Sequence, residues 1–415
     1  MNACIHRGSK EIGGSCVEVV SNGKRIIIDL GLLLDAKENN SSLLPNVKGL
    51  DGNDDLLLAI IISHIHLDHF GLLAYVDKKI PVIMGKAARN IATAAAPFMP
   101  GAWTVPNAGL DMVSEKSFVL GPFTITPFLT DHSGYDAYSL LIEADGKRLF
   151  YSGDLRMHGA KAKLTERMIE HAPENINVLL LEGSSLGRID SATSFPSEED
   201  IEEQFVKEYE RTAGMVLVQV SSQNIDRIVK IFRACKRTGR RLVIDLYSAV
   251  ILEATGNENI PQSDWPEVAV YIPQRQRVQI KNEKWFELLQ HHSTNRIYLK
   301  DLKEISERSV LLFRSLHMSD LEQAGCLRGA SYIYSLREGY WEQGSYDHIR
   351  NWLEKHSIPK VSIHTSGHAS PADLKRFADG LKPRRIVPIH TFAPEKYSEL
   401  FDNVEFHNDG KYWEV

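Results

Sequence analysis

The stretch SHIHLDHFG, residues 63–71, places three histidines and one aspartate within six residues. It follows the apolar run LLLAIII at 56–62, which predicts a buried strand. Imidazoles at positions i and i+2 of a loop that leaves a strand can converge on one cation, and an Asp-His pair beside them can face a second. A run of surface histidines is the alternative, but it explains neither the apolar strand nor the intervening aspartate. The stretch therefore predicts a metal site at a strand end.

Two further candidate ligands follow predicted strands. His132 lies in LTDHSGYDAYS, and Asp154 lies in LFYSGDLR. Each would be ordinary alone, because a single histidine at a strand end is more often structural. Together with residues 64–69 they complete a two-metal hydrolytic site in which the Asp154 carboxylate can bridge both ions. Imidazole and carboxylate ligands suit zinc, with manganese or iron as alternatives.

The composition indicates a globular protein of more than one domain. The chain has 415 residues, of which 43% are hydrophobic and 25% charged. The net charge of −6 argues against a uniformly basic nucleic-acid-binding protein but allows a local basic groove. The four cysteines are dispersed and form no CxxC pair, which favours a reducing compartment. We see no signal peptide and no apolar run of membrane-spanning length, and therefore expect a cytoplasmic enzyme without membrane association.

The order of predicted elements indicates a layered α/β protein. Asn-Gly at 22–23 and Asp-Gly at 145–146 predict two hairpins, residues 215–245 read as strand–helix–strand, and residues 371–383 as a capped helix. Residues 255–300 are left unassigned, because Asn, Pro, Gln and Trp interrupt their pattern. We expect an α/β domain at 1–190, an inserted α/β module at 191–350 and a return to the first domain at 351–415.

The pattern HxHxDH, followed by an isolated histidine and then Gly-Asp, resembles the metallo-β-lactamase superfamily. The resemblance implies an αββα sandwich with two divalent metal ions. One ion would be bound by His64, His66, His132 and Asp154, and the other by Asp68, His69, Asp154 and one further histidine. Asp29, at the end of RIIID, matches the family's early strand-end aspartate, which holds a metal-ligating imidazole.

Later motifs narrow the resemblance to one branch of that superfamily. Glu182 in LLLEGSSLGR precedes the predicted insert, and His364 and His368 in HTSGHAS and His390 in RIVPIH follow it. This order resembles motifs A, B and C of the β-CASP nucleases and is most similar to the ribonuclease J group. After His390 this chain has Thr-Phe where that group has Gly-Glu. Since the sequence stops at 415, the resemblance implies a compact member without the C-terminal domain through which bacterial members dimerise; an oligomer has no other support.

The resemblance also implies roles for these residues. His390 would complete the second metal's ligands, and Asp68 and Asp29 would belong to the catalytic set. His368, oriented by Glu182, would act as hydrogen-bond donor and general acid to the leaving oxygen. A set of small and polar residues would contact substrate phosphates, namely Ser366, Gly367 and His364, with Ser221 and Ser222 of the turn SSQNIDRI. Hydrogen-bonded loop histidines are the alternative for positions 364 and 368.

The resulting functional hypothesis is a metal-dependent ribonuclease that cleaves single-stranded RNA as an exonuclease, an endonuclease or both. A DNA nuclease of the same family is one alternative, and a small-molecule hydrolase such as a thioesterase or lactonase is another. The latter needs neither an insert of this size nor the carboxylate–histidine pair at 182 and 368. A non-enzymatic scaffold or RNA-binding protein is a fourth hypothesis, which the apparently complete ligand set disfavours.

Basic runs at 233–241, 274–281 and 382–385, together with Arg227, have two interpretations. They could line a groove that tracks phosphates. They could equally be solvated helix ends, where Lys and Arg complement the helix dipole. Tyr334, Tyr340 and Trp341 could likewise stack on bases or belong to a core.

Overall fold

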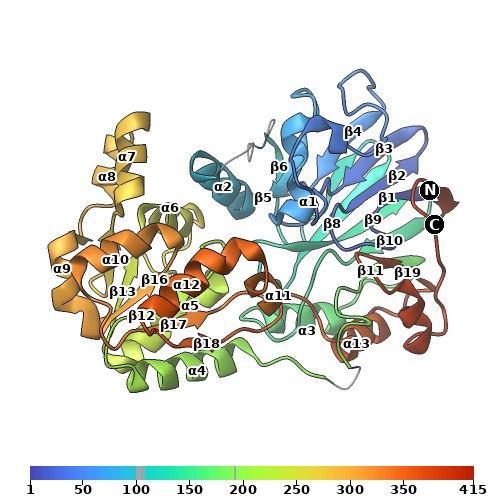
Figure 1. Ribbon diagram of the computed structural model, residues 1–415. Coiled ribbons are helices and arrows are strands. Elements are labelled where there is room, and N and C mark those ends of the chain that lie inside the picture. Colours follow the sequence, from blue (N-terminus) through green and yellow to red (C-terminus); the bar gives the residue numbers. More distant parts are fainter. Residues whose placement is uncertain (100–104, 106–107, 191–192) are drawn as a thin grey trace. The chain divides into compact units, whose positions relative to one another are not determined.

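The computed structural model describes residues 1–99, 105, 108–190 and 193–415, and the chain forms two compact units (Figure 1). The first unit comprises residues 1–195 and 367–415, and the second unit comprises residues 196–366. The sequence-based boundaries, 190/191 and 350/351, differ from these at the return to the first domain. There, β18 (Lys360–Ser362) pairs in parallel with β17 (Ser331–Tyr334), and this pairing places 360–362 in the sheet of the second unit.

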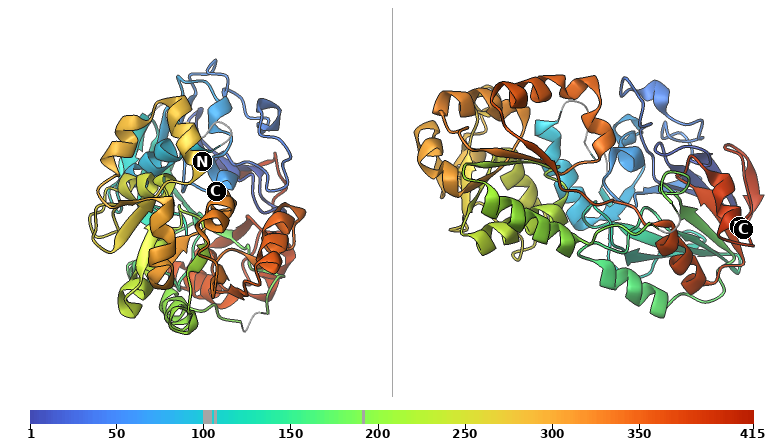
Figure 2. Two further views of the ribbon diagram at one scale, coloured as in Figure 1. Left: turned by 60° about the vertical axis from the view of Figure 1, so that its left-hand side comes forward. Right: turned by 60° about the horizontal axis from the view of Figure 1, so that its bottom comes forward.

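The described residues of the first unit form two sheets. The seven-stranded sheet has the order β20-β1-β2-β3-β4-β5-β6, with β1 (Asn2–Arg7), β2 (Cys16–Ser21), β3 (Lys24–Ile28), β4 (Leu57–Ile61), β5 (Val82–Gly85), β6 (Ala108–Met112) and β20 (Tyr412–Glu414). The six-stranded sheet has the order β19-β11-β10-β9-β8-β7, with β7 (Phe118–Leu120), β8 (Phe123–Leu129), β9 (Tyr138–Ala144), β10 (Lys147–Tyr151), β11 (Val178–Glu182) and β19 (Arg385–Ile389). The two termini lie side by side, where β20 pairs with β1 (Figures 1 and 2).

Alternating side chains explain how the two sheets pack. Val17 and Val19 of β2 and Leu140 and Ile142 of β9 are fully buried in one core that draws on both sheets. Successive side chains of a strand point to opposite faces, so the intervening residue Leu141 packs on the outer side of the six-stranded sheet. That outer core includes residues of α3 (Ala162–Glu170) and α13 (Pro371–Leu381); the other helices of the unit are α1 (Leu67–Phe70) and α2 (Lys86–Ala95). The predicted αββα sandwich is confirmed.

Local sequence signals form the predicted turns and caps. Asn22 and Gly23 join β2 to β3 with φ of 47° and 72°, and Asp145 and Gly146 join β9 to β10 with φ of 51° and 69°. Two positive φ angles define the hairpin turn that Asn-Gly and Asp-Gly favour. At 371–381, the Ser370 side chain and Asp373 form a capping box ahead of α13. Both hairpins and this capped helix are confirmed.

The second unit is a parallel α/β layer. Its sheet has the order β15-β14-β13-β16-β12-β17-β18, and all its pairings are parallel. The remaining strands are β12 (Val216–Gln219), β13 (Arg241–Ile244), β14 (Val268–Tyr271), β15 (Arg296–Ile297) and β16 (Ser309–Leu312). The helices are α4 (Glu198–Arg211), α5 (Ile225–Thr238), α6 (Leu246–Ala254), α7 (Gln274–Glu283), α8 (Phe286–His291), α9 (Leu299–Ile305), α10 (Met318–Ala324), α11 (Glu338–Trp341) and α12 (Asp347–Lys355). The inserted α/β module and its strand–helix–strand at 215–245 are confirmed.

Several basic and aromatic residues of the second unit are structural rather than exposed. Arg227 is fully buried and makes a bidentate ion pair with Glu198, with both N–O distances at 3.0 Å. The buried Arg240 donates to the carbonyls of Tyr209 and Gly214, at 2.9 Å each. Tyr334 and Trp341 lie in the core of the unit. The hypothesis that Arg227 contacts phosphates is therefore wrong, because its guanidinium is enclosed and neutralised.

Replacing Arg227 by alanine is expected to destabilise the second unit by about 3–5 kcal/mol, because it leaves the Glu198 carboxylate buried without its bidentate partner. Urea unfolding followed by tryptophan fluorescence measures this, since four of the six tryptophans lie in the second unit. Lys236→Ala, which removes an exposed cation from the same helix, is the control and should change stability by less than about 0.5 kcal/mol. Equal effects of the two substitutions would contradict this account.

Among the helices in the described part of the chain, none is both long enough and apolar enough to cross a membrane.

Candidate metal centre

The ends of parallel strands bring the candidate ligands together in the first unit. β3 is parallel to β4, and β10, β11 and β19 are parallel to one another. The residues that follow the strands of each group therefore lie at the same end of their sheet. The residues so placed are Asp29 after β3, His64 after β4, Asp154 after β10 and His390 after β19, while Glu182 ends β11 and His132 lies between β8 and β9.

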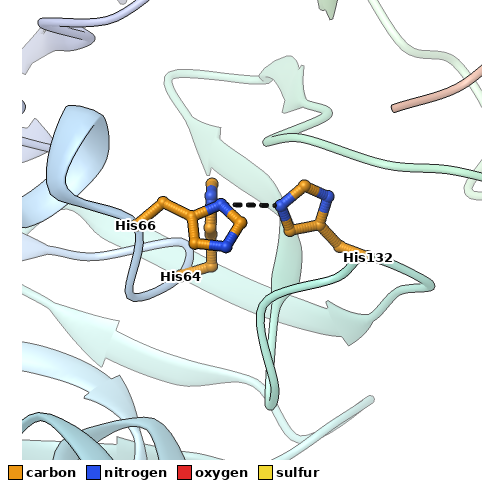
Figure 3. Close-up of side chains that lie close together, drawn as sticks. All are labelled: His64, His66 and His132. Carbon is orange, nitrogen blue, oxygen red and sulfur yellow. Dashed lines mark hydrogen bonds between the residues drawn. The ribbon is translucent and has the colours of Figure 1, made fainter. Parts of the chain in front are cut away.

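Three histidines face one another in the first cluster (Figure 3). His132 Nε2 lies 3.1 Å from His66 Nδ1, and the His64 ring centroid lies 4.8 Å from that of His66 and 4.5 Å from that of His132. Two ligand atoms of a tetrahedral zinc ion, with bonds of about 2.0–2.1 Å, are separated by about 3.3 Å. The distance between His132 Nε2 and His66 Nδ1 is close to this value. Gly134 permits this crowding, because a Cβ there would lie only 3.2 Å from the His64 ring.

The Asp154 carboxylate joins this cluster to a second one. Its Oδ2 lies 3.7 Å from His64 Nε2, 3.2 Å from His69 Nε2 and 3.6 Å from His390 Nε2. His390 Nε2 also lies 3.7 Å from Asp68 Oδ2, and Asp68, His69 and His390 offer ligand atoms within 4.8 Å of one another. Asp154 is therefore placed where one carboxylate can bridge two cations.

Unsatisfied buried atoms test whether these residues fit metal ions. Among the described residues, His64 Nε2, His69 Nε2, His390 Nε2 and both carboxylate oxygens of Asp154 are buried and form no hydrogen bond. A buried polar atom without a hydrogen bond lowers the stability of the fold, and coordinated cations would satisfy these atoms. The donor set is imidazole and carboxylate, which suits divalent ions. The residues therefore fit divalent metal ions.

The protonation states of most of these groups suit metal binding. Burial, with neighbouring histidines, lowers the pKa of His64 and of His132 well below the usual histidine range, so both are neutral donors. Burial tends to raise the pKa of Asp154, but His390, His69 and His368 hold it well below its usual range. Burial tends to lower the pKa of His69, but the carboxylates of Asp154 and Asp29 outweigh burial and raise this pKa well above the usual histidine range. Metal binding at His69 Nε2 would therefore require loss of the proton that this raised pKa favours.

Asp29 orients the histidine loop. One of its oxygens accepts hydrogen bonds from the Ser63 hydroxyl (2.8 Å), from His69 Nδ1 (2.7 Å) and from the Tyr151 hydroxyl (2.7 Å), and the other accepts from Ser63 N–H (2.7 Å). The bond from His69 Nδ1 directs its Nε2 towards Asp154. Asp29 has a φ of 60°, a conformation that non-glycine residues seldom adopt and that concentrates at functional sites.

Replacing Asp29 by asparagine is expected to weaken metal binding at the His69 cluster by about 10- to 100-fold, the usual effect of losing a carboxylate behind a ligating histidine. Competition with a chromophoric zinc chelator measures the affinity. Asp55→Asn, an exposed carboxylate on the loop before β4, serves as control and should bind metal as the unchanged protein does. Unaltered affinity in Asp29→Asn would show that the carboxylate does not orient a ligand.

Sequence reasoning missed several residues that position the ligands. The Ser15 hydroxyl lies 2.9 Å from His390 Nδ1, which turns His390 Nε2 towards the cluster, and Ser63 and Tyr151 hold Asp29. Gly31 is required because a Cβ there would lie 1.7 Å from the carbonyl oxygen of Asp68. The only available signals were the Gly-Gly-Ser run after β1 and the serine that precedes the HxHxDH motif.

His368 and Glu182 form a pair beside the two clusters. His368 Nδ1 lies 3.3 Å from Glu182 Oε1 and 3.7 Å from Asp154 Oδ2. Glu182 is itself fixed by backbone N–H groups of Leu155 (3.3 Å) and Ser184 (3.0 Å). Burial opposes protonation of His368, but Glu182 and Asp154 outweigh it and raise its pKa to about 9. The imidazole is therefore cationic at neutral pH and able to donate a proton.

The predicted phosphate-contacting residues divide between the two units. Gly367 lies in the first unit, where a Cβ would come within 2.7 Å of the Ser133 hydroxyl oxygen. His364, Ser366, Ser221 and Ser222 lie in the second unit. Ser221 is exposed between β12 and α5, whereas Ser222 is buried and its hydroxyl lies 2.8 Å from that of Ser248. Their role in substrate binding stays a prediction.

Two domain families match the sequence of this chain. Residues 25–202 match the beta-lactamase superfamily domain, and residues 360–398 match the Zn-dependent metallo-hydrolase RNA specificity domain. The second region contains His364, His368 and His390. Both matches therefore fall on segments that supply residues of the site.

Curated relatives carry the name ribonuclease J. The Mycoplasma pneumoniae protein is 22% identical over 412 residues, covering 92% of this chain and 66% of the relative. The Sinorhizobium meliloti protein is 23% identical over 380 residues (88% and 63%), and one Helicobacter pylori protein is 22% identical over 399 residues (92% and 55%). This chain thus spans less than two thirds of the length of these relatives.

A solved structure shares the fold over the whole chain. A protein of unknown function from Enterococcus faecalis is 22% identical, with a TM-score of 0.80 and coverage of 99% of both chains. Taken with the two domain matches and the relatives, the strand-end histidine and aspartate clusters show that this chain contains a metallo-β-lactamase superfamily domain and is similar to the ribonuclease J proteins.

Proposed function

We propose that this chain is a two-metal-dependent phosphodiesterase that cleaves single-stranded RNA. The observation that carries the proposal is the position of Asp154, whose Oδ2 lies within 3.7 Å of His64, His69, His390 and His368 alike. A bridging carboxylate between two ion sites, with a cationic histidine beside it, is the arrangement that phosphodiester hydrolysis needs. The ribonuclease J relatives and the RNA specificity domain support RNA as the substrate.

The roles of the side chains follow from their positions. His64, His66 and His132 would hold one ion and Asp68, His69 and His390 the other, with Asp154 between them. Divalent ions held there would polarise the scissile phosphate and activate the attacking water. Zinc fits the ligands best, with manganese as the alternative. His368, whose Nδ1 faces Glu182, would donate the proton at Nε2 to the leaving oxygen.

A gel assay tests the proposal with RNA carrying a 5′-monophosphate, a 5′-triphosphate or a 5′-hydroxyl, in the presence of Zn²⁺ or Mn²⁺. Asp68→Ala is the control, and cleavage that is present in the unchanged protein and absent in this variant is the expected result. Preferential release of mononucleotides from the 5′-monophosphate substrate indicates an exonuclease, and internal fragments from all three indicate an endonuclease. Intact RNA in every lane, with metal measured in the protein, would refute the proposal.

A DNA nuclease is the second candidate, since the proposed centre would act on the phosphodiester linkage that DNA and RNA share. Single-stranded DNA of the same sequence, assayed under the same conditions, separates the two. Faster cleavage of DNA than of RNA would assign the chain to DNA. A small-molecule ester or lactone that is hydrolysed while both nucleic acids stay intact would assign it to the third class.

A further inference from the structure

We propose that Glu253, His291 and His292 form a separate metal site in the second unit that takes one Zn²⁺ ion. Glu253 lies in the last turn of α6, His291 ends α8 and His292 follows it. Each offers a ligand atom, and the three atoms lie within 4.8 Å of one another. All three residues belong to the second unit, so the site is distinct from the strand-end clusters of the first unit.

One of the two distances from Glu253 to the imidazoles matches a shared ion. His292 Nε2 lies 3.4 Å from Glu253 Oε2, close to the separation of about 3.3 Å expected between two ligands of a tetrahedral zinc ion. His291 Nε2 lies 2.5 Å from the other oxygen of the same carboxylate, which is a hydrogen-bond distance, so His291 must turn away slightly to share an ion; its exposed side chain is free to do so. Two imidazoles and one carboxylate are a ligand set that zinc adopts in proteins, with a fourth position left for water.

The decisive observation is an unsatisfied buried nitrogen. The His292 side chain is 2% exposed, and its Nε2 forms no hydrogen bond within the described part of the chain. Its other nitrogen, Nδ1, lies 2.9 Å from the Ser263 hydroxyl. If Nδ1–H donates to Ser263, Nε2 presents its lone pair to the carboxylate, a repulsive arrangement that a cation between them turns into an attraction. The contact between His292 Nδ1 and Ser263 is of the kind that orients metal-ligating histidines.

A simple ion pair accounts for less of this geometry. One imidazolium bound to Glu253 would satisfy His291, whose side chain is 61% exposed, and would leave His292 Nε2 buried beyond the usual 2.7–3.2 Å range of a hydrogen bond. An ion satisfies both rings. The Glu253 and His291 side chains are 48% and 61% exposed, so Zn²⁺ can enter from solvent. The bound ion would tie the end of α6 to the end of α8.

Equilibrium dialysis against buffered Zn²⁺, with the metal counted by mass spectrometry, tests the site. His291→Gln should bind one equivalent fewer than the unchanged chain, and because the His291 side chain is exposed, the substitution leaves the packed core unchanged. Glu253→Gln should behave alike. The matched control is His356→Gln. His356 also pairs with a glutamate, Glu322, at 2.6 Å, but it belongs to none of the candidate metal clusters among the described residues. The control should retain every equivalent.

Repeating the titration in an Asp154→Ala background separates this site from the proposed catalytic centre. One equivalent of Zn²⁺ should remain bound to Asp154→Ala, and none should remain bound when His291→Gln is combined with it. Zn²⁺ should also slow hydrogen exchange in residues 286–292 of the unchanged chain and not of His291→Gln. Equal zinc stoichiometry in His291→Gln and the unchanged chain, or equal losses in His291→Gln and His356→Gln, would overturn the site whatever the outcome with RNA.

Discussion

Asp154→Ala is expected to strip metal from both strand-end clusters and to lower the proposed phosphodiesterase activity by at least about a thousandfold, or about 4 kcal/mol at roughly 1.4 kcal/mol per tenfold. The reason is that its carboxylate lies within ion-pair distance of histidines from both clusters and forms no hydrogen bond with any described residue. Without it, six neighbouring ligand residues lose the anion that offsets the charge of two divalent ions. Metal content by mass spectrometry and initial rates on RNA measure the two effects.

A matched control separates loss of metal from damage to the fold. Asp136, also in the first unit, accepts hydrogen bonds from the backbone of Ala87 (2.9 Å) and Ala88 (3.1 Å) at the start of α2. Asp136→Asn should cost about 1 kcal/mol of stability and leave both metals in place. Metal retained in Asp154→Ala, at the level of Asp136→Asn, would contradict the bridging role.

His368→Ala is expected to lower turnover by about 10²- to 10⁴-fold, the range for losing a general acid, while both metals stay bound. The imidazole is held by Glu182 at 3.3 Å, and its raised pKa of about 9 keeps it protonated at neutral pH. Because the acid must carry its proton, the wild-type rate should fall as the pH rises past the pKa of His368, and this alkaline limb should vanish in the variant. A pH–rate profile under single-turnover conditions measures it.

Two comparisons make this result specific. Glu182→Gln should reduce the rate less than His368→Ala, because it removes the orienting charge and keeps the proton donor. His171→Ala, at the end of α3, is the neutral control. The distance of 3.7 Å from His368 Nδ1 to Asp154 allows one contrary outcome: His368 could itself be a ligand. Metal loss in His368→Ala equal to that in Asp154→Ala would establish that assignment.

The motifs in the sequence were enough to predict the fold class and the residues that meet in the first unit. HxHxDH, Gly-Asp and the isolated histidines stand directly after apolar runs, and parallel strands bring such positions to one edge whatever lies between them. The two hairpin turns could also be predicted from the sequence, since Asn-Gly and Asp-Gly favour the positive φ angles that both turns adopt.

Other features depended on contacts between distant residues. Arg227 looked like a candidate phosphate ligand until the fold enclosed it with Glu198, 29 positions away in sequence. Residues 255–300 carried no readable pattern, yet they form β14, α7, α8 and β15 and bring His292 towards Glu253. Periodicity reports which face of one element is apolar, and it contains no information about the partner that a polar side chain meets.

The sequence by itself therefore determined the metal-binding character of this protein, because ligand type and strand-end position are local properties. The tertiary structure decided how close the candidate ligands lie to one another, that the imidazole bonded to Asp29 is that of His69, and which cations are neutralised inside the second unit. Those outcomes depend on distances of 2.7–3.7 Å between side chains that lie far apart in sequence, for example 322 positions for His390 and Asp68, and only the packed sheets set such distances.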